Sequence, residues 1–152
     1  VKITAISTHI VNAEMRNWVF VRVETDQPGL YGWGEATLEW KTRAVAGAID
    51  DLAPLILGQD PRDIEQIVRI LKKQSFWRLG VIGMSAISGI EIALWDLAGR
   101  ILETPVCNLL GGRFRDKVRF YRTMQSPEGN LEDMQRYKDF VAEARAEKII
   151  YF

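Results

Sequence analysis

The spacing at which apolar residues recur changes near residue 37, from every two residues to about every 3.6 residues. This change constrains the fold more than any other feature of the chain. Before it, alternating and β-branched residues favour three strands, at residues 2–11, 18–25 and 30–36. Pro28 and Gly29 supply a turn between the last two segments. The N-terminal part is therefore predicted to be a three-stranded antiparallel meander.

The connection between the first two predicted strands is residues 12–17, which include Glu14 and Arg16. It is longer and more polar than a tight hairpin requires. We expect an open polar loop here, of the kind that carries binding residues.

Three apolar stripes with helical spacing follow residue 37. The first stops at Gly58, and the second is predicted to start with Asp60 as its cap and Pro61 in its first turn. The third, residues 85–102, is apolar around most of its circumference, so it should be buried on several sides, with Trp95 largely hidden. These helices should form a bundle against the meander.

Composition excludes several classes of protein. The chain is 47% hydrophobic and 26% charged, which is typical of a globular domain, and its 20 basic residues balance its 20 acidic ones. Without a basic field a nucleic-acid partner is not expected, and no apolar run reaches the roughly 20 residues that cross a bilayer. We expect a cytoplasmic protein with no membrane partner. The single Cys107 is interpreted as packed core, and the single His9 is given no catalytic role.

Residues 116–152 begin a second pattern, in which a strand, a helix capped by Asn130 and a second apolar strand follow one another. This order is typical of a βαβ unit. Arg122 directly follows the alternating residues 117–121 and precedes a turn-rich stretch, so it should lie where the first strand ends.

Three motifs together resemble the mandelate racemase and muconate lactonizing enzyme branch of the enolase superfamily. They are Leu-Tyr-Gly-Trp-Gly-Glu-Ala at residues 30–36, Ile-Glu-Ile-Ala-Leu-Trp-Asp-Leu-Ala-Gly at residues 90–99 and Pro-Val-Cys-Asn-Leu-Leu-Gly-Gly at residues 105–112. Phe76-Trp77-Arg78 adds a likeness to the acid-sugar dehydratases, such as galactonate and mannonate dehydratases. The resemblance covers residues 1 to about 121.

Structural roles explain much of this signature. Gly32 and Gly34 suit close packing of a strand or a bulge, and the two glycines at residues 111–112 suit a helix end. Glu91 and Asp96 are acidic residues within the predicted buried helix, where such groups more often satisfy an arginine or backbone groups than bind a metal.

The resemblance implies an α+β capping domain at residues 1–115, with a meander and a helical bundle, followed at residues 116–152 by the beginning of a (β/α)8 TIM-type barrel. In this family Mg²⁺ is held by three carboxylates on later barrel strands. A base removes the proton α to the substrate carboxylate, and in dehydratases loss of the β-hydroxyl then yields a 2-keto-3-deoxy acid. All these groups would lie beyond Phe152, so no catalytic residue and no metal ligand is expected here, and the 152 residues alone should be inactive.

What the chain is expected to contribute is a cover over the barrel mouth that contacts a small-molecule sugar acid. The candidate substrate-binding residues are Glu14, Arg16, Glu39, Trp40, Arg78 and Arg122. The resemblance places Arg122 at the end of the first barrel strand, where its guanidinium would hold a carboxylate or hydroxyl. Trp77 is interpreted as core.

Other functions stay open from the sequence. The same family includes racemases, epimerases and cycloisomerases, and residues beyond this chain would distinguish them from a dehydratase. A non-catalytic binding module is a third possibility. A homo-oligomer is expected for the longer enzyme.

Overall fold

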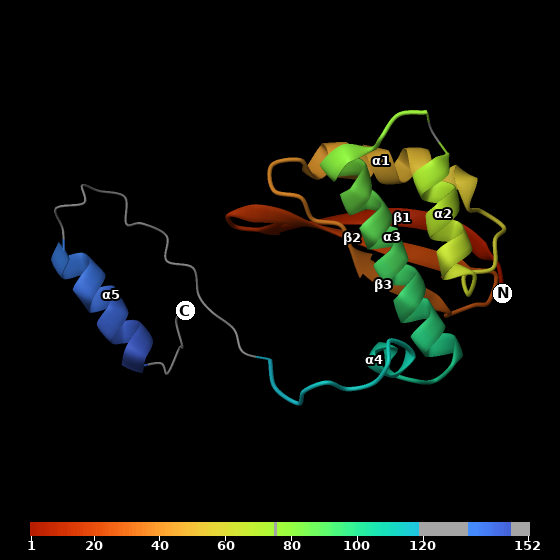
Figure 1. The fold of residues 1–152 in the computed structure, drawn as a ribbon. Coiled ribbons are helices and arrows are strands. Elements are labelled where there is room, and N and C mark those ends of the chain that lie inside the picture. Colours follow the sequence, from red (N-terminus) through yellow and green to blue (C-terminus); the bar gives the residue numbers. More distant parts are fainter. Residues whose placement is uncertain (75, 119–133, 147–152) are drawn as a thin grey trace. The chain divides into compact units, whose positions relative to one another are not determined.

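The computed structural model describes residues 1–74, 76–118 and 134–146 (Figure 1). The chain divides into two compact units, Val1–Gly112 and Arg113–Phe152, which are described separately below. The boundary predicted from the sequence, between residues 115 and 116, stays a prediction about where the capping domain of the longer enzyme ends.

The first unit contains a three-stranded antiparallel sheet in the order β1-β2-β3. The strands are β1 (Ile3–Ala13), β2 (Arg16–Thr25) and β3 (Tyr31–Glu35). β1 pairs with β2 from Ile3 opposite Thr25 to Ala13 opposite Arg16, with an irregularity near Ala5. The predicted meander is confirmed.

The predicted open loop at residues 12–17 is wrong, because strand pairing continues to the end of the hairpin. Asn12 faces Asn17 and Ala13 faces Arg16, which leaves only Glu14 and Met15 to make the turn. Glu14 has a φ of 58°, the left-handed conformation that two-residue hairpin turns require. The Asn12 side chain accepts a bond from the Glu14 N–H (3.3 Å) and donates one to Asn17 (3.3 Å). The polar residues therefore serve the turn itself.

Helices cover one face of this sheet (Figure 1). They are α1 (Thr42–Leu52), the short 3-10 helix η1 (Ala53–Leu55), α2 (Ile64–Lys73), α3 (Gly80–Ile101) and α4 (Val106–Leu109). α1 and α3 contact the strands, and α2 packs on α3. The core between these layers holds fully buried Val21 of β2, Ile49 of α1, Leu71 of α2 and Leu94 of α3.

Glycines let α3 approach the sheet closely. A Cβ at Gly32 would lie 2.1 Å from the carbonyl oxygen of Ala93, and one at Gly34 would lie 2.0 Å from that of Gly89. No side chain fits at either position unless the backbones separate. The predicted packing role of Gly32 and Gly34 is confirmed.

Asp96 of α3 fastens the helix to the edge of the sheet. Its Oδ2 accepts a hydrogen bond from the backbone N–H of Trp33 (2.9 Å) and another from Nε of Arg100 (3.0 Å). The sequence-based interpretation of Asp96 as a partner for an arginine or the backbone is confirmed.

The start of α2 differs from the prediction. The helix begins at Ile64 with Asp63 as its N-cap residue, so Asp60 does not cap it. Asp60 instead binds Arg62: its carboxylate accepts bonds from the Arg62 backbone N–H (2.9 Å), from Nε (2.9 Å) and from the terminal NH2 nitrogen (2.6 Å). Side chains such as aspartate often fold back on their own turn in this way, which competes with helix capping.

Three predictions about aromatic and sulfur side chains need correction. Trp95 is partly buried and packs at the margin of the core, and Cys107 in the short helix α4 is exposed. Trp77, interpreted as core, is 79% exposed. Hydrophobic character alone does not fix burial for residues at the rim of a helical layer.

Within the described residues, α3 alone has the length and apolar composition that a membrane span would need. Half of that stretch is buried inside the unit, against the sheet and the other helices. Its apolar character is thus accounted for by its place in the core.

The second unit contains α5 (Met134–Ala146), in agreement with the predicted helix. Residues 116–118 form no strand. The remainder of that predicted strand, the Asn130 cap, Arg122 and the apolar end at residues 149–152 lie outside the described residues.

Gly34→Ala should lower the free energy of unfolding by at least about 2 kcal/mol, because the added methyl overlaps the backbone of α3. Gly47→Ala is the matched control: it lies in α1 with nothing within 4 Å of the added Cβ. That substitution should stabilise the chain by about 0.5–1 kcal/mol. Urea unfolding of both variants tests the pair, and equal effects would contradict the close packing of β3 and α3.

The free energy of unfolding should also depend on pH, because of the carboxyl group of Asp60. Hydrogen bonds from the Arg62 side chain and backbone hold the pKa of the Asp60 carboxyl well below its usual range. This contribution is complete above the pKa of the unfolded chain, about 3.9, and is lost as the pH falls through the lower folded pKa. Asp60→Asn should therefore be less stable than the parent at pH 7, with a smaller difference at acid pH. Urea unfolding across this range tests it, and a difference independent of pH would contradict it.

Candidate functional site

An ion pair joins two of the candidate residues predicted from the sequence. Arg16, the first residue of β2, lies 2.6 Å from the Glu39 carboxylate. Glu39 belongs to the β3–α1 segment, residues 36–41. Because Arg16 follows the hairpin turn directly, the pair ties the tip of the β1–β2 hairpin to this segment. The Arg16 side chain is 40% exposed and the Glu39 side chain is 38% exposed, so a ligand can reach both.

Backbone hydrogen bonds give the β3–α1 segment a defined path. Ala36 donates to the carbonyl of Val19 (2.8 Å), and the hydroxyl of Thr37 accepts from the Val19 N–H (3.0 Å). These bonds continue the pairing of β2 with the chain beyond β3. Trp40 then adopts a φ of 57° and exposes 86% of its surface. An indole held outward on a fixed backbone offers an apolar face to a ligand.

A groove of about 780 Å³ lies beside this segment. The residues that line it come from both strands of the hairpin, from the segment and from the start of α1: Ile10, Asn17, Trp40, Lys41, Thr42, Arg43 and Ala44. Lys41 and Arg43 give the groove positive charge, Asn17 adds an amide, and Trp40 adds an aromatic wall. This combination suits a small polar anion.

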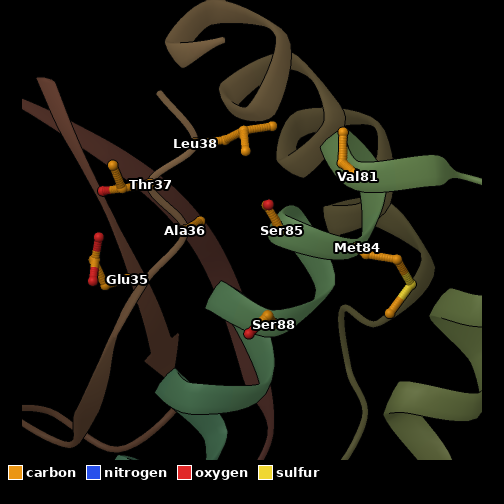
Figure 2. A pocket seen from close by; sticks show the side chains of 8 residues that line it. All are labelled: Glu35, Ala36, Thr37, Leu38, Val81, Met84, Ser85 and Ser88. Carbon is orange, nitrogen blue, oxygen red and sulfur yellow. The ribbon is translucent and has the colours of Figure 1, made fainter. Parts of the chain in front are cut away.

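A second groove, of about 510 Å³, lies between the β3–α1 segment and α3 (Figure 2). The β3–α1 segment, with Thr37 and Leu38, forms one wall, and the first turns of α3, with Met84, Ser85 and Ser88, form the other. Its lining is more apolar and lacks a basic side chain. It is a weaker candidate for an anionic ligand than the groove with Lys41 and Arg43.

The remaining predicted site residues are more scattered. Glu14 lies in the hairpin turn, two residues from Arg16. Arg78 is exposed in the segment before α3, and within the described part of the chain it forms no ion pair with Glu14 or Glu39. Arg122 lies outside the described residues, so its place stays a prediction. The structure thus brings together Arg16, Glu39 and the loop of Trp40.

Sequence analysis missed three residues of this surface. Thr37 orders the segment through its hydroxyl, while Asn17 and Arg43 line the larger groove. Thr37 directly follows the strand motif, and a hydroxyl at such a position is a recognisable capping signal. Nothing in the sequence indicates that Asn17 and Arg43 face the same groove, because they come from different elements.

Metal ligands are not gathered in the described part of the chain. It contains no group of three or more His, Cys, Asp or Glu side chains that could hold a metal ion. The described residues therefore do not fit a Mg²⁺ site, which needs several oxygen ligands around one point.

Residues 2–111 match the family model for the mandelate racemase / muconate lactonizing enzyme N-terminal domain. A D-galactonate dehydratase family member from Streptomyces sp. strain SPB074 is 44% identical over 121 residues, which are 79% of this chain and 27% of that protein. The D-galactonate dehydratase of Verminephrobacter eiseniae is also 44% identical, over 120 residues, which are 79% of this chain and 30% of the relative. The chain thus spans about a third or less of the length of these relatives.

Solved structures agree with this relationship. An enolase from Pantoea ananatis, crystallised with bound D-gluconate and Mg, is 42% identical with a TM-score of 0.75 and matches 78% of this chain and 29% of its own. An enolase from Agrobacterium radiobacter, bound to Na and L-malate, is 33% identical with a TM-score of 0.83 and matches 97% of this chain and 36% of its own. With the family match over residues 2–111, these likenesses show that the chain belongs to the mandelate racemase / muconate lactonizing enzyme family of the enolase superfamily.

Proposed function

We propose that this chain is the N-terminal capping part of a Mg²⁺-dependent acid-sugar dehydratase. The longer enzyme would remove the proton α to a sugar-acid carboxylate and eliminate the β-hydroxyl as water, and the resulting enol would tautomerise to a 2-keto-3-deoxy acid. The observation that carries the proposal is the 44% identity to D-galactonate dehydratases over four fifths of the chain.

The surface around the Arg16–Glu39 pair supports a role in substrate recognition. A sugar acid carries one carboxylate, several hydroxyls and a C–H face. Lys41 and Arg43 can donate hydrogen bonds to the carboxylate or to hydroxyl oxygens, Asn17 can bond hydroxyls, and the exposed Trp40 ring can cover the C–H face. We propose that Glu14 and Arg78 extend this surface and that Arg122 contacts the acid from the barrel side.

The chemistry itself is assigned to the rest of the enzyme. We propose, as the family resemblance implies, that the ligands of Mg²⁺ and the base belong to later barrel strands of the longer enzyme. The function of the 152 residues is then to bind, orient and enclose the substrate, which excludes water from the reacting carbon. We expect the enzyme to act in the cytoplasm as a homo-oligomer.

The full-length enzyme that carries this chain should convert a sugar acid to a 2-keto acid. We would incubate it with D-galactonate, D-gluconate and galactarate in the presence of Mg²⁺ and detect the product as its semicarbazone. Turnover should stop with EDTA and return with added Mg²⁺. The 152-residue chain alone should give neither turnover nor stoichiometric Mg²⁺ binding by calorimetry.

Other outcomes of the same assay separate the alternatives. Exchange of the α-proton with solvent deuterium without keto-acid formation would indicate a racemase or epimerase and contradict dehydration. Absence of both exchange and product with every acid would contradict an acid-sugar enzyme and favour the non-catalytic module.

The Arg16–Glu39 pair gives a second test. In the full-length enzyme, Arg16→Met should lower kcat/KM roughly ten- to a hundredfold, because it frees the hairpin from the β3–α1 segment and misplaces groups around the substrate. Its free energy of unfolding should fall by less than about 1 kcal/mol, since exposed ion pairs contribute little to stability. Arg69→Met, at an exposed position of α2, is the matched control and should change neither quantity. Equal kinetics of the two variants would remove the pair from substrate recognition.

A further inference from the structure

A threonine side chain replaces a backbone carbonyl at the point where the chain leaves the sheet. Ala36 donates from its N–H to the carbonyl of Val19 (2.8 Å). In a regular antiparallel pair the Val19 N–H would return a bond to the Ala36 carbonyl. The hydroxyl of Thr37 accepts that bond instead (3.0 Å). The Thr37 side chain thus completes the pairing of β2 where β3 has already ended, at Glu35.

The bond between Val19 and Thr37 has no substitute from solvent. Val19 is fully buried in the core, so its N–H cannot bond water. A buried backbone N–H that loses its partner destabilises the fold. Because threonine is β-branched, its side chain also has few rotamers. The bond therefore fixes the backbone of Thr37 together with its hydroxyl.

The next residues form a turn that starts from this fixed point. Lys41 donates from its N–H to the carbonyl of Leu38 (3.1 Å), and its own carbonyl accepts from the N–H of Val45 in α1 (3.0 Å). The side chains of Thr37 and Leu38 point to opposite sides of the segment, and Leu38 packs against the core (Figure 2). The turn is therefore held by Val19 at one end and by α1 at the other.

Trp40 is the third residue of this turn and has a φ of 57°. Bulky side chains rarely adopt this left-handed conformation. A residue persists in it only where the surrounding contacts hold it there, and such residues are found most often at ligand sites. Loss of the Thr37 hydrogen bond should let the turn relax and move Glu39, Trp40 and Lys41 together.

We propose that Thr37 is a positioning residue for substrate binding, whose hydroxyl holds the turn so that Glu39, Trp40 and Lys41 are in place before the ligand arrives. This inference rests on the proposed function of the surface in binding a sugar acid. Thr37 acts through the turn, because its hydroxyl oxygen is engaged by the Val19 N–H. A turn already held in its binding conformation loses less freedom when the ligand binds.

Three variants of the full-length enzyme separate this role from a general effect on stability. Thr37→Val removes the hydroxyl and keeps the shape of the side chain, whereas Thr37→Ser keeps the hydroxyl. Thr25→Val is the matched control. Thr25 is also half-buried, at the opposite end of β2, and its hydroxyl donates to the carbonyl of Leu30 (2.7 Å) in the β2–β3 connection.

The kinetics should change in KM more than in kcat, because the turn contacts parts of the substrate that bind equally in the ground and transition states. Thr37→Val should raise KM for the sugar acid about tenfold and change kcat less than about threefold. Thr37→Ser should bring KM back to within about threefold of the parent value. Thr25→Val should lower stability about as much as Thr37→Val does and leave KM unchanged.

Hydrogen exchange of single amides tests the same bond without turnover. In the parent enzyme, which needs no variant to fold, the amides of Val19 and Lys41 should open together as urea is added, because loss of the Thr37 bond frees both. In Thr37→Val the Lys41 amide should exchange at least roughly tenfold faster than in the parent. In Thr25→Val its exchange should be unchanged.

Four results would overturn the proposal. They are an unchanged KM in Thr37→Val, an equal rise of KM in Thr25→Val, a Thr37→Ser variant as impaired as Thr37→Val, and a Lys41 amide that opens independently of Val19. A parent enzyme that turns over no sugar acid would contradict the proposed function, and with it the sugar acid as ligand. The exchange of Lys41 would still show whether Thr37 holds the turn, so the two failures are distinguishable.

Discussion

The near contact between the backbones of β3 and α3 is the constraint on which the rest of this unit depends. Gly32 and Gly34 leave no room for a side chain against Ala93 and Gly89, so the helix lies directly on the strand. At that separation the Asp96 carboxylate reaches the Trp33 N–H. One short approach thus buries the apolar side of α3, sets the position of the helical layer and covers the outward N–H of Trp33 at one edge of the sheet.

The same packing determines how the functional surface is built. β3 ends against the first half of α3, and residues 36–41 leave it along a path held by Val19 and Thr37. That path brings Glu39 to Arg16 and lets residues of the segment line two grooves. The side chains proposed to contact a sugar acid are exposed and mostly charged, while the parts that position them are buried and apolar. A rigid sheet-and-helix layer can therefore support surface residues that differ between enzymes with different substrates.

Much of the fold could be predicted because it rests on local patterns. Alternation of Val19, Val21 and Val23 indicates a half-buried strand, and the paired glycines of β3 indicate a close approach before the approaching helix is known. Predictions failed where two local signals compete. Asp60 can cap a helix or bind its own turn, and residues 12–17 can form a loop or finish a hairpin, so the outcome depends on the surrounding register.

The sequence by itself determined the family, the strand order and the identity of the helix that fills the core. Hydrophobic periodicity and the glycine motifs are local patterns, so they can be recognised without the tertiary structure. Only the tertiary structure decided that Arg16 meets Glu39, that Asn17 and Arg43 share a groove, and that Asp96 accepts the hydrogen bond of the Trp33 N–H. Each of these contacts is between residues more than 20 positions apart in the sequence. Their contact depends on how the layers pack, which no local pattern of residues contains.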